Sequence, residues 1–355
     1  MRTNKQFQLE PMIMKIKDLV RENIIGLSPY SSARDEFNSS NDFIYLDANE
    51  SSYQSDLNRY PDNRHIKLTK LISSYKNINT ENLVLCNGTD ELIDLVIRVF
   101  CNPGVDSIIT LNPTYGMYDV SSKINDVENV KIQLDKNFQI DFNEVISRFN
   151  HRTKIIFIAN PNNPTGNNFD QDDILKIIKS FRGIVFIDEA YIDYSNESFL
   201  NQIYSYNNLI ISQTFSKALG LAGIRLGVGY SNEEIIYYLK KIKPPYNINS
   251  LTEKKAIKSL TKQYVDIDQV NETINERKSL ELKLIELDFV STVFPSNSNF
   301  LLIKVDDANK RYKQLIDHGI VVRNRSNVKG CENCLRITVG TPEQNKILIN
   351  TLKKI

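Results

Sequence analysis

The chain has 355 residues, 41% hydrophobic and 25% charged, with 44 basic against 43 acidic side chains. A nucleic-acid partner normally selects a basic excess, so this near balance argues against one. No apolar run reaches the roughly 18 to 20 residues of a membrane-spanning helix, and the start of the chain lacks the apolar stretch of a secretory signal. We therefore expect a cytoplasmic protein without a membrane partner.

Four cysteines are too few for a disulfide framework in a chain of this length. Cys331 and Cys334 form a single CxxC pair, and neither a second cysteine pair nor a histidine pair accompanies it. Because a lone CxxC occurs in many unrelated sequences, we interpret these thiols as incidental and expect no metal site.

Short apolar strands alternate with helical patterns after a loose lead-in over residues 1–11. Several strands are apolar at consecutive positions, as strands buried on both faces are. The βαβα order predicts a mostly parallel sheet covered by helices. The expected strands are 83–86, 105–110, 130–134, 154–158, 183–187, 208–213 and 225–230, and the expected helices are 64–76, 89–101, 141–149 and 170–181.

The pattern changes after about residue 245, where a long charged helical stretch leads to about 287. The following segments predict a smaller α+β domain, with strands at 289–294, 299–304, 320–323 and 334–339 and helices at 306–318 and 342–354. We therefore divide the chain into an N-terminal segment, which we expect to join the small domain, a large domain and a small C-terminal domain: residues 1–44, 45–285 and 286–355.

A strand followed by a loop over residues 212–227, SQTFSKALGLAGIRLG, carries a lysine and an arginine. Lys217 lies just beyond the strand, where a neutral amine can form an imine with an aldehyde cofactor. The planar guanidinium of Arg225 suits a phosphate group, and Thr214 and Ser216 add hydroxyl donors. Taken alone, this pattern also fits a solvated lysine in a loop of small residues.

Asp188 follows the strand predicted at 183–187, and the ends of such strands gather ligand-binding groups. A carboxylate there can keep a pyridine nitrogen protonated, which makes the ring an electron sink. Tyr191 lies in the same DEAY segment and could reach the ring's phenolic oxygen. The alternative for Asp188 is a carboxylate that caps the following helix. A metal ligand lacks support, since no histidine cluster accompanies it.

Two turns supply further candidate contacts. Residues 160–166, NPNNPTG, place Asn163 on a turn fixed by two prolines and a glycine, and a plain tight turn is the alternative. Residues 87–91, NGTDE, begin a helix whose free N–H groups could hold a phosphate, and a capping box is the alternative. Neither a Walker GK[ST] nor a GxGxxG pattern accompanies them, so a dinucleotide site lacks support.

Together these segments supply what one cofactor needs, and in this combination the chain resembles the fold-type I pyridoxal-phosphate-dependent aminotransferases. That resemblance implies an α/β fold with a mostly parallel central sheet, helices on both faces and a smaller α+β domain. Within the superfamily, the chain resembles the histidinol-phosphate aminotransferase family from about Leu27 onward. The matching stretches are LSPYSSAR (27–34), LDANE (46–50), NRYPD (58–62), NPTYGMY (112–118), NPNNPTG (160–166), DEAY (188–191), TFSKALGLAGIR (214–225) and CLRITVG (334–340).

The resemblance implies that Lys217 forms a Schiff base with pyridoxal 5'-phosphate and then moves the proton at the substrate's α-carbon. Asp188 would pair with the pyridinium nitrogen. Asn163 and Tyr191 would bind the ring's 3-oxygen, and Tyr115 would stack on the ring. The groups implied for the cofactor phosphate are the backbone N–H groups of Thr89 and Asp90 together with Thr214, Ser216 and Arg225.

The family is homodimeric with an active site shared between subunits, so the resemblance implies the same assembly here. Tyr60 of NRYPD would reach the cofactor phosphate from the partner subunit. On the substrate side, Arg336 and Arg323 resemble the family's anion-binding arginines, and Tyr30 and Asn299 match substrate-side positions.

The implied reaction is a ping-pong amino transfer between L-histidinol phosphate and 2-oxoglutarate, which yields glutamate, in histidine biosynthesis. Two arginines suit a site that accepts a phosphate in one half-reaction and a dicarboxylate in the other. Residues 324–333 show no match to the family pattern. The assignment of Arg323 therefore rests on less than that of Arg336, and its alternative is a surface residue beside Arg325.

Three other functions stay open at this point. A threonine-phosphate decarboxylase or an aromatic or broad-specificity aminotransferase would share the fold and the cofactor residues. A non-catalytic regulator built on the same fold would need a DNA-binding extension, for which residues 1–40 are too short and insufficiently basic.

Overall fold

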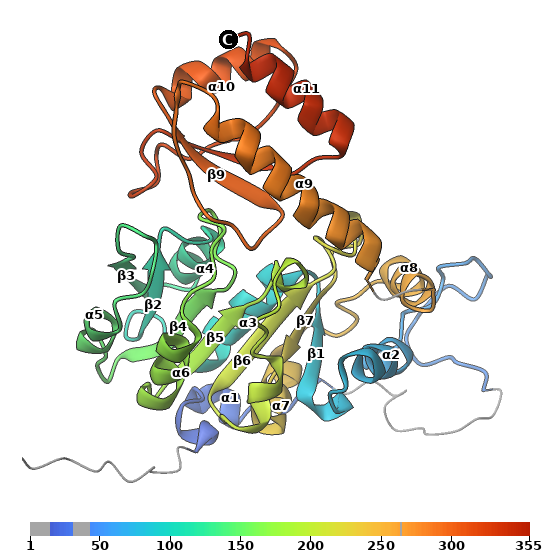
Figure 1. The fold of residues 1–355 in the computed structure, drawn as a ribbon. Helices are drawn as coiled ribbons and strands as arrows, with labels where there is room; N and C mark the ends of the chain where they lie inside the picture. Colours follow the sequence, from blue (N-terminus) through green and yellow to red (C-terminus); the bar gives the residue numbers. More distant parts are fainter. Residues whose placement is uncertain (1–14, 31–42, 263–264) are drawn as a thin grey trace, which may run out of the picture.

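The computed structural model describes residues 15–30, 43–262 and 265–355, which form a large and a small domain. Figure 1 shows the small domain, orange to red, above the large domain. The expectations for the lead-in at 1–11 and for residues 31–34 of the LSPYSSAR stretch lie outside the described residues. No helix in the described parts of the chain is both long enough and apolar enough to cross a membrane.

Seven strands form the sheet of the large domain: Leu83–Cys86 (β1), Ser107–Asn112 (β2), Glu128–Gln133 (β3), Thr153–Ala159 (β4), Ile184–Asp188 (β5), Leu209–Thr214 (β6) and Gly227–Tyr230 (β7). Their order across the sheet is β1-β7-β6-β5-β4-β2-β3. Among these described strands, β7 pairs antiparallel with both of its neighbours, β1 and β6, whereas the pairs that join β6, β5, β4, β2 and β3 are parallel. The predicted mostly parallel sheet is thus confirmed.

Helices cover both faces of this sheet because its strands are apolar on both sides. In β4, Ile156 and Ile158 pack into the core on one face, while Ile155 and Phe157 pack into the core on the other. The first face carries Ile66–Lys76 (α2), Phe142–Ser147 (α5), Gln171–Ser180 (α6) and Ser250–Leu260 (α8), and the second carries Thr89–Phe100 (α3), Met117–Ile124 (α4) and Glu233–Ile242 (α7).

The short 3-10 turns of the large domain lie mainly in the loops that follow its strands. Those turns are Thr80–Asn82 (η3), Ile192–Tyr194 (η4), Leu200–Tyr204 (η5) and Ala222–Ile224 (η6).

The small domain contains an antiparallel sheet in the order β10-β11-β9-β8, made of Val290–Val293 (β8), Phe300–Val305 (β9), Arg323–Asn324 (β10) and Cys334–Thr338 (β11). Helices Ala308–Asp317 (α10) and Pro342–Leu352 (α11) pack against it. Cys331 and Cys334 are buried beside this sheet, and burial raises the pKa of Cys331 to about 12 and that of Cys334 to about 11. Thiols with such pKa values stay protonated at neutral pH and are poor nucleophiles.

The helical stretch expected to run to about 287 is two helices rather than one. After α8, the helix Ile267–Ile285 (α9) runs between the two domains (Figure 1). Val270, near its start, packs against Tyr191 of the large domain, and Leu284, near its end, lies in the core of the small domain.

The described part of the N-terminal segment differs from its expected position. Residues 1–44 were expected to join the small domain, but Ile16–Asp18 (η1) and Glu22–Ile25 (α1) pack on the large domain. Ile16 and Ile24 are buried in the core shared with α3 and α7, and the Lys241 Nζ donates to the backbone oxygen of Ile25 at 2.9 Å. Three spaced apolar residues, Ile16, Val20 and Ile24, cover a patch of that core, and their spacing in the sequence does not specify which domain they pack against.

Candidate active site

A cavity of about 690 Å³ lies where the carboxyl ends of the large-domain strands face the small domain. Parallel strands end at a common edge of a sheet, so residues far apart in the sequence meet there. Twelve residues singled out from the sequence line this one cavity: Thr89, Asp90, Tyr115, Asn163, Asp188, Tyr191, Thr214, Ser216, Lys217, Arg225, Arg323 and Arg336.

Lys217 lies just beyond the end of β6, and its backbone is fixed by the strand and the turn that follows. Phe215 N donates to Leu226 O at 3.0 Å, and Gly220 N donates to Lys217 O at 2.9 Å. The Lys217 Nζ lies 5.5 Å from the centre of the Tyr191 ring. Burial lowers the pKa of Lys217, and the positive charge of Arg336 lowers it further. Both effects favour the neutral amine, which is the nucleophilic form.

Asp188 ends β5 and is only 4% exposed. Its carboxylate accepts hydrogen bonds from Tyr118 Oη at 2.9 Å, Ser212 Oγ at 2.9 Å and Ala190 N at 3.1 Å. Burial raises the pKa of Asp188, and these hydrogen bonds oppose the rise. A fixed, buried carboxylate of this kind is strongly stabilised in its ionised form by a cationic partner in the cavity.

Asn163 links the two domains across the cavity. Its Nδ2 donates to Tyr191 Oη at 3.5 Å, and its Oδ1 accepts from the Arg336 Nη1 of the small domain at 2.5 Å. The turn that carries it is held by the neighbouring Asn162, whose Nδ2 donates to Pro113 O and to Thr165 Oγ1, each at 2.8 Å. Burial raises the pKa of Tyr191 to about 12, so its hydroxyl remains a hydrogen-bond donor at neutral pH.

The start of α3 and Arg225 form another part of the cavity lining. Gly88, the N-cap residue of α3, has no side chain to occupy the first N–H groups of the helix. A Cβ at Gly88 would lie 2.8 Å from Arg225 Nη2, and a Cβ at Gly227 would lie 2.6 Å from Thr89 N. The two glycines therefore let the guanidinium and the helix start approach each other, as an anion site requires.

Arg225 itself has a backbone φ of 54°, a left-handed conformation that side chains other than glycine rarely adopt. Its guanidinium lies 3.6 Å from a carboxylate oxygen of Asp90, which also accepts from Tyr115 Oη at 2.9 Å.

These groups fit pyridoxal phosphate, the cofactor implied by the resemblance. The helix start with Arg225 matches a phosphate, the buried carboxylate of Asp188 matches a pyridinium nitrogen, and the amine of Lys217 matches an aldehyde. Asn163 and Tyr191, which line the same cavity, offer hydrogen-bond donors that would suit a ring hydroxyl. The match of donor types along one cavity supports the cofactor roles.

The small domain contributes three arginines to the same cavity: Arg323, Arg325 and Arg336. Arg323 in β10 pairs directly with Arg336 in β11. The guanidinium of Arg336 also lies 5.2 Å from the centre of the Phe300 ring. Arg325 was regarded from the sequence only as a surface neighbour, and its lining of the cavity is a finding of the structure.

Three predicted residues do not line the cavity of their own chain. Tyr30 is 64% exposed and borders a separate basic cavity near α2. Asn299 hydrogen-bonds to Tyr194, and its backbone oxygen accepts from Val339 N at 2.9 Å. Tyr60 is 51% exposed, and its ring stacks on that of Tyr246 with the ring centres 4.7 Å apart.

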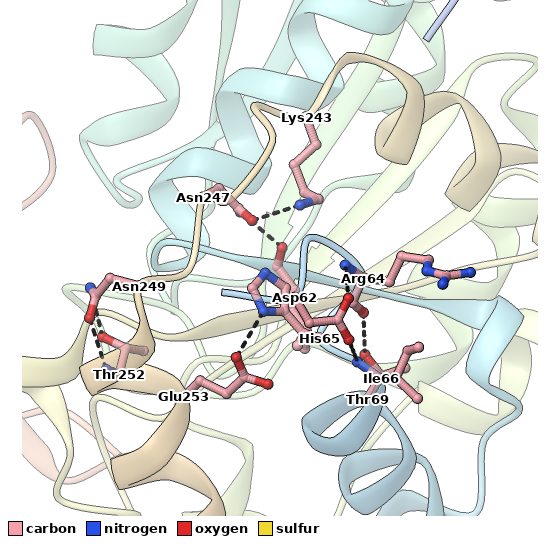
Figure 2. Close-up of polar contacts among 11 residues, drawn as sticks. Asp62, Arg64, His65, Ile66, Thr69, Lys243, Asn247, Asn249, Thr252 and Glu253 are labelled. Atoms are coloured by element: carbon pink, nitrogen blue, oxygen red, sulfur yellow. Dashed lines mark hydrogen bonds and ion pairs between the residues drawn. The ribbon is translucent and has the colours of Figure 1, made fainter. Parts of the chain in front are cut away.

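The segment that carries Tyr60 is nevertheless well fixed. Glu50 accepts from Tyr60 N at 2.6 Å and pairs with the Arg59 guanidinium at 2.7 Å. Figure 2 shows the contacts that follow it: Asp62 accepts from the backbone of Arg64 and Ile66, and His65 Nδ1 lies 3.3 Å from a carboxylate oxygen of Glu253 in α8. Tyr60 is therefore presented at the surface on a held loop.

Tyr118 and Ser212 are functional candidates that the sequence analysis missed, since both donate to Asp188. Tyr118 is the last residue of the matching stretch NPTYGMY, and Ser212 lies two residues before the matching stretch TFSKALGLAGIR. A helix that begins within NPTYGMY would have been the signal for Tyr118, because it turns this side chain toward the sheet.

Residues 31–352 match the family described as aminotransferase class I and II. The histidinol-phosphate aminotransferase of Flavobacterium psychrophilum is 51% identical over 342 residues, covering 96% of this chain and 99% of that protein. That of Parabacteroides distasonis is 49% identical, covering 96% and 99% respectively. The crystal structure of the histidinol-phosphate aminotransferase from Clostridium acetobutylicum superposes with a TM-score of 0.76 at 29% identity, covering 84% of this chain and 91% of that one.

A second solved structure shares the fold alone. The L-threonine-O-3-phosphate decarboxylase of Porphyromonas gingivalis superposes with a TM-score of 0.70 at 21% identity, covering 83% of this chain and 92% of that one. The fold therefore does not distinguish amino transfer from decarboxylation, whereas the sequence relatives do.

Proposed function

The chain belongs to the histidinol-phosphate aminotransferases of the class I and II aminotransferase family, and we propose that it exchanges an amino group between L-histidinol phosphate and 2-oxoglutarate with pyridoxal phosphate as cofactor. The observation that carries this proposal is that Lys217, Asp188, Arg225 and the three small-domain arginines line one cavity.

When bound, pyridoxal phosphate supplies an aldehyde and an electron-withdrawing ring. Lys217 presents its amine to that aldehyde, and the lowered pKa of this amine keeps a share of it neutral. The same amine, once free, can take the proton from the substrate's α-carbon and return it elsewhere. Asp188, held by Tyr118 and Ser212, supplies a fixed negative charge that holds a proton on the ring nitrogen.

Arg336 is proposed to bind the carboxylate of 2-oxoglutarate or glutamate and to assist in binding the amino-alcohol substrate. Its contact with Asn163 places this cation next to the residues proposed for the cofactor ring. Arg323 lies opposite it in the sheet and is proposed for the substrate's phosphate. Guanidinium groups suit both anions because they donate two parallel hydrogen bonds.

Arg336→Ala is expected to raise KM for 2-oxoglutarate about 10- to 100-fold, because a hydrogen bond to a charged group contributes roughly 1.5–3 kcal/mol. The cofactor's visible absorption should persist, since the residues proposed for its phosphate are unchanged. Steady-state kinetics and an absorption spectrum measure the two effects. Unchanged KM values would remove Arg336 from the substrate site.

A homodimer with a shared site is proposed from the position of Tyr60, which lies on a fixed, exposed loop outside its own chain's cavity. Exposed aromatic side chains on such loops suit contact with a partner. In this assembly the Tyr60 hydroxyl reaches the cofactor phosphate of the partner subunit.

Tyr60→Ala alone is expected to lower activity at least about tenfold. Hybrid dimers of Tyr60→Ala and Lys217→Ala chains, isolated through two different tags, then carry one fully intact site. They should recover about half of the wild-type activity per dimer, because a two-fold dimer has two equivalent sites. Hybrids no more active than the Tyr60→Ala homodimer would show that Tyr60 does not act across the dimer.

The reaction itself is tested by incubating the protein with L-histidinol phosphate and 2-oxoglutarate and measuring glutamate. Glutamate formation at a rate well above that with aromatic amino donors supports the proposal. Release of carbon dioxide from threonine phosphate, without glutamate formation, would instead support a decarboxylase of the same fold.

A further inference from the structure

Three guanidinium groups occupy one face of the ribbon formed by β10 and β11. Arg323 and Arg336 are direct cross-strand partners, and Arg325 N continues the ladder by donating to Cys334 O at 2.9 Å. Side chains two residues apart on an extended chain point the same way, so Arg325 follows Arg323 on the face toward the cavity. Asn324 points oppositely and donates to Asn309 Oδ1 of α10 at 2.8 Å.

The backbone around Arg325 is fixed. Its N–H is bound by Cys334, and its own carbonyl oxygen accepts from Val328 N at 2.8 Å. Cys334 in turn donates from its backbone to Cys331 O at 3.0 Å, which links the segment 324–333, for which the sequence showed no family match, to the stretch CLRITVG. Arg325 thus lies on a turn whose backbone is held by hydrogen bonds, next to the cavity that it lines.

The guanidinium of Arg325 lacks a partner at one buried position. Its Nε is shielded from solvent and donates to no acceptor among the described residues. Leaving a buried charged donor unsatisfied costs more than a neutral one, so such groups normally have an anion or water beside them. Arg325, which lines the cavity, therefore has a guanidinium that the protein's own acceptors do not fully satisfy.

The charges around the cavity also favour an anion near the small-domain arginines. Its only described acidic residues are Asp90 and Asp188. Asp90 lies 3.6 Å from Arg225 of the large domain, and Asp188 is bound by Tyr118 and Ser212. The three small-domain arginines therefore have no carboxylate partner among the described residues. Like charges placed opposite one another on a sheet destabilise it unless they are compensated.

We infer that Arg325 is a specificity-determining residue that binds the phosphate group of the substrate together with Arg323. The inference rests on the proposed function, since it requires a phosphorylated substrate in this cavity. A phosphate monoester carries close to two negative charges at neutral pH and has three acceptor oxygens, so it can engage more than one guanidinium. Each carboxylate of 2-oxoglutarate carries one charge and two acceptor oxygens, which a single guanidinium such as that proposed for Arg336 can bind.

The test combines a substitution at Arg325 with removal of the phosphate group from the substrate. Single-turnover rates are measured for wild type and Arg325→Gln, each with L-histidinol phosphate and with L-histidinol, which lacks the phosphate. Arg325→Gln should lower kcat/KM for histidinol phosphate about 10- to 100-fold and leave that for histidinol within about twofold. Arg325→Lys, which keeps the charge but not the fork of donors, should fall between wild type and Arg325→Gln.

Lys329→Gln is the matched control, since it removes one positive charge from the same turn at an exposed position outside the cavity. Its kcat/KM for histidinol phosphate should equal that of wild type. Equal losses with both substrates in Arg325→Gln, or a loss below twofold with histidinol phosphate, would overturn the inference. Should Arg325→Gln fail to fold, the same comparison of kcat/KM for histidinol phosphate and histidinol is made with Arg325→Lys. Wild type that does not turn over histidinol phosphate would instead overturn the proposed function.

Discussion

Replacing Lys217 by alanine is expected to lower kcat by at least about 10³-fold, because one amine serves both as the nucleophile toward the cofactor and as the group that moves the α-proton. The cofactor's long-wavelength absorption should disappear together with turnover. The fold should be unaffected, since the Lys217 side chain is only partly buried and lies beside a cavity. Thermal melting, absorption spectra and steady-state rates measure the three effects.

Two controls separate the covalent role from the charge. Lys217→Arg keeps a positive charge at the site but cannot form the imine, so it should be as inactive as the alanine variant. Lys179→Ala removes an exposed lysine of α6 and should retain wild-type activity. Lys217→Arg with more than a tenth of wild-type activity would contradict the assignment.

Asp188→Asn is expected to lower kcat/KM roughly 10²- to 10⁴-fold, because removing one partner of a buried ion pair costs roughly 3–5 kcal/mol. The asparagine has a similar shape: its Oδ1 can still accept from Ser212 Oγ and Ala190 N, whereas its Nδ2 replaces the oxygen that accepts from Tyr118 and can only donate to that hydroxyl oxygen. Burial raises the pKa of Asp188, so its ionised form is disfavoured in the cofactor-free fold. The stability that this group contributes falls as pH rises from the ordinary carboxyl pKa to the raised pKa, and it stays low above that. The cofactor-free variant should therefore melt no lower than wild type at neutral pH.

Tyr118→Phe is the companion variant, since it removes one hydrogen bond to Asp188 and keeps the negative charge. It should lower kcat/KM no more than about tenfold. An Asp188→Asn protein that unfolds would show that the carboxylate serves mainly the turn at Ala190, to whose N–H it is bonded.

Most of the fold could be predicted from the sequence because burial determines where apolar residues occur along each strand. Strands buried on both faces, such as β4 and β5, must be apolar at consecutive residues. Residues 155–159 (IIFIA) in β4 and 184–187 (IVFI) in β5 meet this requirement. The antiparallel β7 was not predictable, since a short strand of glycines and apolar residues has no pattern that encodes its direction. The break between α8 and α9 was also missed, because both helices are rich in charged residues and a loop between them is similar in composition.

The candidate site could be predicted wherever a motif carries its residues. The order of the matching stretches along the chain is specific to the family. Four of the residues that they carry line the cavity: Lys217, Asp188, Asn163 and Arg225. Arg325 could not be found in this way, because its segment has no family match and its direction depends on pairing with β11. The roles of Tyr30 and Tyr60 stay predictions, since a single chain leaves both outside the cavity.

The most direct test of the Lys217 assignment is to add pyridoxal phosphate to the purified protein, reduce with borohydride, digest it and locate the pyridoxyl group by mass spectrometry. The expected result is one stoichiometric adduct on the peptide that contains Lys217, absent from Lys217→Arg. A stoichiometric adduct on another lysine, or the absence of any adduct, would contradict the assignment.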